Sequence, residues 1–362
     1  MSAAEEVRCM LMRGGTSKGA YFLADDLPAA PGARDDLLLR VMGSPDPRQL
    51  DGLGGAHPLT SKVAVISASA APGADVDYLF LQVGVDRPEV SGRQNCGNLL
   101  AGVGPFAVER GLVGAGPERT SVRIRMVNSD DLAVATFATP GGRVDYGGTA
   151  EISGVPGTAA PVLVEFPPGP RPLLPTGRAR DTVAGTPLTC VDNGMPTVLI
   201  AASALHVTGY EDPGDLEEDR ALADRLRAIR REAGKLMGLG DTTAATVPKL
   251  SLLAPPLHGG AVMTRTFIPV RCHPSIGVLG AAGVAAGLRV AGGVGEGLAR
   301  LPAHGDLLRI EHPTGFLDIE AAVDQRPDGA GPVARRTTVV RTARKIFDGT
   351  VFPRPAATAA HP

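Results

Sequence analysis

The sequence contains no tryptophan and few other aromatic residues, with 9 Phe and 4 Tyr among 362 residues. Its core must therefore be built mainly from Val, Leu, Ile and Ala. Together with 47 Gly and 32 Pro, this composition favours a β-rich or α/β protein with many tight turns. The length predicts about two domains.

Charge of one sign is not in excess. The chain has 36 Lys and Arg against 38 Asp and Glu, a formal net charge of −2, and neither sign forms a long block. The sequence therefore shows no block of basic charge of the kind that binds nucleic acid or an anionic membrane. The sequence leaves the oligomeric state open, with a homodimer as one option.

Targeting and membrane signals are also missing. The first 13 residues contain Glu5 and Glu6 and no apolar run of signal-peptide length. The most apolar segment, Ile276–Val294, is rich in glycine and includes Arg289, so it indicates a buried helix and its exit rather than a membrane span. We expect a cytoplasmic protein.

Several motifs of cofactor and nucleophile chemistry are absent. The four cysteines are far apart and form no C-x-x-C pair, and the seven histidines include no pair at helical ligand spacing, so we predict no metal site. The glycine-rich segment Arg13–Gly19 lacks the residue order of a nucleotide-binding loop. His273–Gly277 lacks the first glycine of a nucleophile elbow. We expect no cofactor.

The chain reads as many short strands interrupted by a few helices. Strands are predicted at Val63–Ser67, Tyr78–Val85, Val122–Val127 and Ala133–Thr136. Helices are predicted at Asn98–Arg110, Glu217–Leu236 and Ser275–Leu288. The first and third of these helices are small and apolar, which predicts that they are buried.

The two apolar helices indicate an internal repeat. Each follows a small polar cluster. A proline-containing turn recurs at an offset of 173 residues (Pro140 to Pro313), and a glycine turn recurs at an offset of 179 residues (Gly15 to Gly194). We predict two similar halves, residues 1–165 and 166–362, with the boundary in the proline-rich stretch Pro156–Pro175. Helix N-termini that meet in such a fold would bind carboxylates, so a small polycarboxylate is the expected ligand.

Two residues are candidates for acid–base chemistry. Cys96 lies at the start of a predicted helix, where free backbone N–H groups favour the thiolate and lower its pKa; the alternative is a small buried apolar residue. Lys62 lies at the mouth of an apolar strand, where desolvation would lower its pKa toward that of a general base. The alternative is a lysine whose stem packs while its ammonium reaches water. Thr16, Ser17 and Lys18 could hold a carboxylate or form an ordinary turn.

Four motifs together resemble a known family. They are Met12–Phe22, Gly43–Gly52, Asn95–Asn98 and Arg271–Gly277. The chain resembles the 4-oxalomesaconate tautomerases over roughly Arg8–Phe352. These are grouped with 2-methylaconitate cis-trans isomerases that share the diaminopimelate-epimerase-like fold. The resemblance implies an α/β (α+β) protein with two pseudo-symmetric halves, each a mostly antiparallel sheet around a central helix.

The resemblance also implies roles for individual residues. Lys62 matches the family's general base, and Cys96 matches a cysteine beside the substrate. The predicted substrate-binding residues are Arg13, Thr16, Ser17, Lys18, Asn95, Gly97, Asn98, Asn193, Arg265, His273, Ser275 and Gly277. The active site is expected to be completed by the second half.

The implied function is a cofactor-independent isomerisation of 4-oxalomesaconate in the breakdown of gallate-type aromatic compounds. Isomerisation of 2-methylaconitate or aconitate is the nearest alternative. A non-catalytic polycarboxylate-binding protein is an alternative of another class. A racemase with two thiols is disfavoured because His273–Ser275 occupies the place of the second cysteine, with Cys272 slightly too early in the chain.

Overall fold

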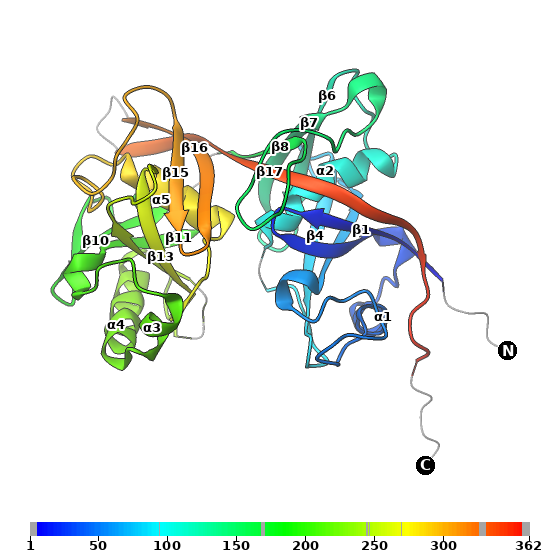
Figure 1. The fold of residues 1–362 in the computed structure, drawn as a ribbon, viewed down its shortest axis with the longest axis horizontal. Coiled ribbons are helices and arrows are strands. Elements are labelled where there is room, and N and C mark those ends of the chain that lie inside the picture. The colour runs from blue at the N-terminus through cyan, green and yellow to red at the C-terminus, as the bar shows by residue number, and fades with distance from the viewer. Residues whose placement is uncertain are drawn as a thin grey trace, which may run out of the picture. The chain divides into compact units, whose positions relative to one another are not determined.

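The computed structural model describes residues 6–93, 95–167, 171–243, 245, 247–268, 270–325 and 331–356. Its described residues divide into two compact units. Unit 1 comprises Met1–Val164 with Arg341–Pro362, and unit 2 comprises Glu165–Val340. Figure 1 shows that each unit places one helix, α2 or α5, among its strands.

Unit 1 is built on a mostly antiparallel sheet. Its strands are β1 (Val7–Gly14), β2 (Ser17–Leu23), β3 (Lys62–Ala68), β4 (Val76–Val83), β5 (Val90–Ser91), β6 (Arg119–Met126), β7 (Asp131–Ala138) and most of β8 (Pro161–Phe166). Strands β2 and β3 pair in parallel, as do β4 and β6. The pairs β1–β2, β3–β4, β4–β5 and β6–β7 are antiparallel.

The central helix of unit 1 is α2 (Gly97–Glu109), which packs against β1, β2, β3, β4, β6 and β7. A helix that is apolar on all sides is buried on all sides, and nine of its residues are buried. Glycine permits the close contact: a Cβ atom at Gly102 would lie 2.5 Å from the Tyr21 hydroxyl oxygen. The sheet can therefore wrap around α2.

Unit 2 repeats this plan. Its strands are β9 (Asp181–Val183), β10 (Thr186–Asp192), β11 (Pro196–Ala201), β12 (Lys249–Ala254), β13 (Val262–Ile268), β14 (Arg271–Cys272), β15 (Leu307–His312), β16 (Gly315–Gln325) and the first part of β17 (Pro332–Val351). Strands β11 and β12 are parallel, as are β13 and β15. The helix α5 (Val278–Leu288) packs against β10, β11, β15 and β16, and all eleven of its residues are buried.

The strand pairing gives equivalent positions in the two units. Lys62, the first residue of β3, is paired with Gly19 of β2. Lys249, the first residue of β12, is paired with Thr197 of β11. In each unit a parallel pair is followed by an antiparallel strand, a short hairpin strand and the central helix. The predicted plan of two similar halves, each a mostly antiparallel sheet around a central helix, is confirmed.

Helices other than the central helices α2 and α5 cover the sheets. They are α1 (Pro31–Met42), α3 (Pro213–Glu218) and α4 (Arg220–Leu236), with 3-10 turns at Ala24–Asp26, Pro58–Thr60, Pro140–Gly142 and Ala202–Leu205. Apolar residues of α1 join the core of unit 1, whereas those of α3 and α4 join the core of unit 2.

Two predicted helices differ from the observed ones. The helix predicted at 217–236 is divided at Asp219, whose side chain accepts a hydrogen bond from the Leu222 backbone N–H at 2.9 Å and so begins α4. The helix predicted from Ser275 begins at Val278, because Gly277 has extended backbone angles and the Ser275 N–H bonds to His273 instead.

The C-terminal residues also depart from the predicted halves, which put all of 166–362 together. Strand β17 pairs with β16 in unit 2 through its first part and with β1 through its second part. Residues from Arg341 onward therefore group with unit 1. The long-range pairing of β17 with β1 has no local sequence signal.

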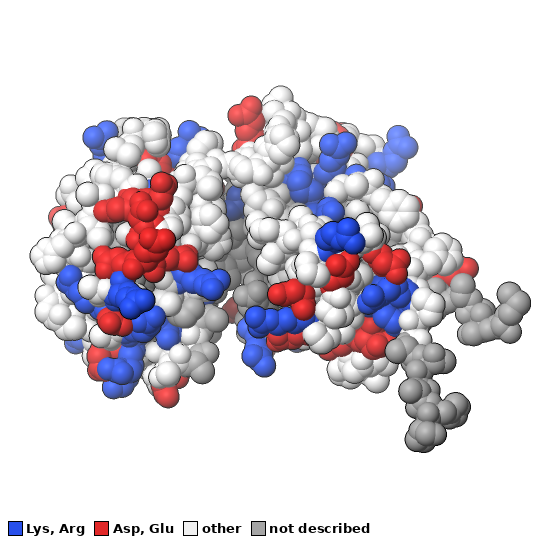
Figure 2. All heavy atoms as spheres, turned by 60° about the horizontal axis from the view of Figure 1, so that its bottom comes forward, with Lys and Arg blue, Asp and Glu red and all other residues white. Residues whose placement is uncertain are grey.

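Charged side chains are interspersed over the surface, and Figure 2 shows both signs on the visible faces of both units. Within the described residues, no helix is both long and apolar enough to span a membrane. Among the same described residues, no group of three or more His, Cys, Asp or Glu side chains is arranged to hold a metal ion.

Candidate active site

Lys62 is buried at the start of β3, with 6% of its surface exposed. Its Nζ donates a hydrogen bond to Gln82 Oε1 at 2.8 Å and lies 4.9 Å from the centre of the Phe80 ring. The Gln82 Nε2 group donates to the backbone carbonyls of Ser61 and Pro58, which fixes the amide with its oxygen toward the lysine. Lys62 is thus held by a neutral partner.

Cys96 is linked to the same strand, β4. It is the residue before α2 and has extended backbone angles. The Tyr78 hydroxyl donates to the Cys96 backbone carbonyl at 3.3 Å. Because side chains at alternate positions share a face of a strand, Tyr78, Phe80 and Gln82 form one row. Lys62, at Gln82, and the backbone carbonyl of Cys96, at Tyr78, therefore contact the same face of β4. Tyr78 and Gln82 are about 14 Å apart along the strand.

Unpaired polar atoms gather around the start of α2. Ser17 Oγ, Asn95 Oδ1 and Asn98 Oδ1 are buried and have no hydrogen-bond partner among the described residues. Asn98 Nδ2 donates to Thr16 Oγ1 at 3.1 Å, so the β1–β2 turn and α2 meet here. Buried polar atoms are normally paired, and such a hydroxyl and amides suit a polar ligand.

The turn between β1 and β2 is fixed by Arg13. Its guanidinium donates to the carbonyls of Gly15 and Thr342 at 2.9 and 3.0 Å, and the Gly15 N–H donates to the Thr342 carbonyl. Arg13 therefore joins the turn to β17 within unit 1. Lys18 extends from the start of β2, and its Nζ lies near Gly55.

Two of the predicted binding residues hold the framework of unit 2. Asn193 Nδ2 donates to the Ala282 carbonyl of α5 and to Thr337 Oγ1. Arg265 is 5% exposed, and its Nε donates to the Glu211 carbonyl at 2.7 Å. Their predicted role in substrate binding stays a prediction.

Of the remaining predicted residues, Gly97 is the first residue of α2, and His273, Ser275 and Gly277 directly precede α5. His273 Nδ1 accepts a hydrogen bond from the Ser275 N–H at 2.9 Å, and Ser275 Oγ lies 3.2 Å from His312 Nε2. Burial lowers the pKa of His273, which favours the neutral imidazole at pH 7. Gly277 precedes α5 in the position that Cys96 has before α2.

The other cysteines lie in cores. Cys9, Cys190 and Cys272 are buried, whereas Cys96 is partly exposed. Burial raises the pKa of Cys9 and of Cys190 to about 12 and that of Cys272 to about 11. Thiols in such surroundings are poor nucleophiles and poor acids or bases at neutral pH.

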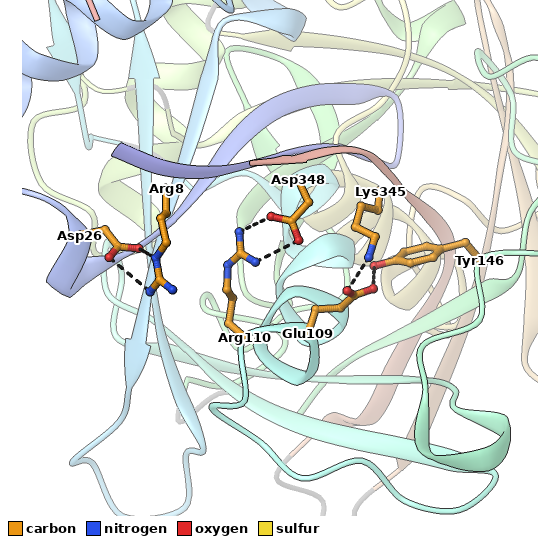
Figure 3. A network of polar contacts seen from close by, with 7 residues as sticks. All are labelled: Arg8, Asp26, Glu109, Arg110, Tyr146, Lys345 and Asp348. Atoms are coloured by element: carbon orange, nitrogen blue, oxygen red, sulfur yellow. Dashed lines mark hydrogen bonds and ion pairs between the residues drawn. The ribbon is translucent and has the colours of Figure 1, made fainter. Parts of the chain in front are cut away.

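The far end of α2 has a structural role. Figure 3 shows Glu109, near its C-terminus, bonded to Lys345 and Tyr146, while Arg110 makes a bidentate pair with Asp348. These contacts attach α2 to β17. A surface hollow lined by Glu109, Lys345 and neighbouring residues therefore lies at the opposite end of the helix from Cys96.

Sequence reasoning missed Gln82 and Tyr78. Both lie in β4, Val-Asp-Tyr-Leu-Phe-Leu-Gln-Val, where a glutamine in an apolar strand was an available signal. It also missed Lys249, which opens an apolar strand after a proline-containing loop, as Lys62 does.

Comparisons with known proteins identify the family of the chain. The model of the PrpF protein family matches residues 4–354. The chain is 54% identical over 349 residues to the (4E)-oxalomesaconate Delta-isomerase of Novosphingobium sp. (strain KA1), covering 95% of this chain and 96% of the relative. It is 53% identical over 351 residues to the 4-oxalomesaconate tautomerase of Pseudomonas putida KT2440, covering 95% of each.

A solved structure extends the match to the fold. The crystal structure of methylitaconate-delta-isomerase superposes with a TM-score of 0.85 at 31% identity and covers 99% of each chain. The fold and the relatives together define an isomerase with two epimerase-like units. The chain belongs to the PrpF protein family.

Proposed function

We propose that this isomerase tautomerises 4-oxalomesaconate by moving a proton. The relative at 53% identity is named a 4-oxalomesaconate tautomerase and the one at 54% identity an oxalomesaconate Delta-isomerase. The observation that carries the proposal is the placement of Lys62 and Cys96 against one face of β4. A fixed lysine on the same strand face as the residue that precedes α2, where unpaired polar groups gather, suits acid–base chemistry on a polar substrate.

Lys62 is the proposed base. In the keto form of the substrate, the carbon between the ketone and the alkene carries an acidified proton. Lys62 would take this proton, and the electron pair of the broken C–H bond would form a new C=C bond while charge develops on the carbonyl oxygen. Protonation of that oxygen gives the enol. No electrons leave the substrate, so the reaction balances without a redox cofactor.

The hydrogen-bond partner of Lys62 suits the role of a base. Its hydrogen-bond partner is the neutral amide of Gln82, and no carboxylate pairs with it among the described residues. An adjacent carboxylate would favour the ammonium form. Gln82 orients the amine without this electrostatic penalty on proton removal.

Cys96 and the polar groups at the start of α2 are proposed to complete the reaction. The Ser17 hydroxyl, unpaired among the described residues, would donate a hydrogen bond to a carboxylate or the developing oxyanion, as would the second N–H of Asn98 Nδ2, whose first N–H bonds to Thr16. Cys96 would relay a proton or shape the site. A cytoplasmic location and a homodimer remain predictions.

The test is the ultraviolet spectrum of 4-oxalomesaconate with purified protein. Wild type should change the spectrum rapidly, and Lys62→Met should be slower by at least about a hundredfold, as expected when a general base is lost. Lys235→Met is a matched control, because Lys235 is exposed on α4 and pairs with Glu232 at the surface. Unchanged turnover by Lys62→Met would refute the role of Lys62.

A second substrate class is tested beside the first. The match to a methylitaconate isomerase structure favours including methylitaconate in parallel assays, beside the alternatives 2-methylaconitate and aconitate. Faster turnover of any of these acids than of 4-oxalomesaconate would replace the proposed substrate. Binding without exchange of substrate protons into D₂O would instead indicate a polycarboxylate-binding protein.

A further inference from the structure

The turn between β6 and β7 holds the segment that leads to Cys96. Asn128 Nδ2 donates to the Gly92 carbonyl at 2.8 Å and to the Phe80 carbonyl at 2.9 Å, and Asn128 Oδ1 accepts from the Phe80 N–H at 2.9 Å. The amide of Asn128 thus bonds to β4 at Phe80 as a neighbouring strand would. It ties the turn both to β4 and to the segment before α2.

The next residue of this turn sets the orientation of Asn95. Ser129 Oγ lies 2.6 Å from Asp131 Oδ2 and 2.6 Å from Asn95 Nδ2. A carboxylate only accepts hydrogen bonds, so the single hydroxyl proton of Ser129 is donated to Asp131. Toward Asn95 the Ser129 oxygen can then only accept, which requires the NH₂ group of the amide at this contact. The Asn95 amide is therefore fixed with Nδ2 at Ser129.

The other end of this amide is an acceptor without a donor. Asn95 Oδ1 is buried and has no hydrogen-bond partner among the described residues, which is a rare condition for a buried polar atom. It belongs to the residue directly before Cys96. Because the amide is fixed, a ligand group that pairs with this oxygen must carry an O–H or N–H.

The two tautomers of the proposed substrate differ in such a group. With its carboxylates ionised, the keto form of 4-oxalomesaconate has only acceptor oxygens, whereas the enol carries one hydroxyl donor. A hydrogen bond that is absent from the bound keto form and appears as the hydroxyl forms would raise kcat rather than tighten the binding of the keto form.

We propose that Asn95 Oδ1 accepts a hydrogen bond from the enol hydroxyl, and that Ser129 is a positioning residue that turns the Asn95 amide for this contact. The identity of the ligand rests on the proposed function, whereas the direction of the amide rests on the contacts of Ser129 with Asn95 and Asp131. Ser129 is exposed on the turn, so its replacement should release the amide and leave unit 1 folded.

The experiment is calorimetric titration of the full chain with butane-1,2,4-tricarboxylate and with its 4-hydroxy derivative, two saturated acids that have no double bond to move. The hydroxyl of the derivative stands on the carbon that carries the enol hydroxyl. Wild type should bind the hydroxy acid about fivefold more tightly, the gain expected for one hydrogen bond to an uncharged acceptor.

The variants should change this preference and not the binding of the plain acid. Asn95→Leu and Ser129→Ala should reduce the preference to less than about twofold, because the acceptor is removed or no longer fixed. Ser129→Thr should restore it, since the hydroxyl is kept. Ser121→Ala is the matched control: this exposed serine of the same unit bonds to Thr136 Oγ1, and its loss should leave the preference unchanged.

Equal affinities of wild type for the two acids, or binding of neither, would overturn the proposal. It would also be overturned by an unchanged preference in Ser129→Ala, or by an equal loss of affinity for both acids in Asn95→Leu, which would show a packing effect. The proposed function is judged separately by turnover. A hydroxyl preference that depends on Ser129, without turnover of 4-oxalomesaconate, would leave this contact and remove the proposed reaction.

Discussion

Lys62 Nζ and Gln82 Oε1 lie 2.8 Å apart across neighbouring strands β3 and β4. The strand register and the carbonyls that accept from Gln82 Nε2 set this contact. A buried amine is thereby held in one direction by a group that carries no charge.

The charge of residue 82 should control the pH dependence of the reaction. Gln82→Glu would place a carboxylate beside the lysine and favour its protonated form. A base that must be deprotonated would then act only at higher pH. We expect the acidic limb of kcat/KM to move upward, with about a tenfold loss of rate at pH 7 for each pKa unit.

The control for this prediction is Gln82→Met, which removes the hydrogen bond without adding charge. It should lower kcat through loss of orientation and leave the acidic limb close to that of wild type. An unchanged pH profile for Gln82→Glu would contradict the assignment of Lys62 as base.

The four cysteines should differ in reactivity. With pKa values raised to about 11 or 12 by burial, Cys9, Cys190 and Cys272 keep about one thiolate in a thousand or fewer at pH 8. Partly exposed Cys96 should therefore be alkylated first by iodoacetamide. Peptide mass mapping measures this order, and Cys96→Ser should show almost no early labelling. Equal labelling of Cys272 in the folded protein would contradict it.

Gly15 should be intolerant of substitution. Its φ is +51°, and a Cβ atom there would lie 2.3 Å from Asn98 Oδ1. Gly15→Ala would strain the turn and displace the amide, costing about 1–3 kcal/mol of unfolding free energy and reducing turnover. Gly73→Ala is a control with positive φ and open space; it should lose stability while keeping activity. Full activity of Gly15→Ala would argue against a role for the turn.

Glu311 should make stability depend on pH. This buried carboxylate accepts hydrogen bonds from the N–H groups of Leu257, His258 and Gly260. Burial acts to raise its pKa, but these bonds together outweigh burial and lower it. The depressed pKa contributes stability above the unfolded value of about 4.3, and this stability is lost as pH falls through the folded pKa.

Glu311→Gln should therefore lower the unfolding free energy by about 2 kcal/mol at pH 7. The difference from wild type should shrink below pH 4. Urea denaturation at several pH values measures it, with exposed Glu218→Gln as control. A difference that stays constant with pH would show that the charge of Glu311 is not the cause.

The sequence by itself determined the plan of the fold. The two helices that are apolar on every side were recognisable because such a helix must be enclosed, and the polar clusters before them marked where they begin. Lys62 and Cys96 stood out for the same local reason: each is a reactive residue at the edge of an apolar element. The motifs also carried the resemblance to the family.

Only the tertiary structure decided what surrounds those residues. Gln82 follows Lys62 by 20 positions, and Thr342 lies 329 positions from Arg13, so neither contact has a local pattern. Strand register established Lys249 as the counterpart of Lys62, since a lysine before an apolar strand is a weak signal and the two segments share few identical residues. Register and long-range pairing depend on the simultaneous packing of the whole sheet, and for this reason a local reading of the chain could not supply them.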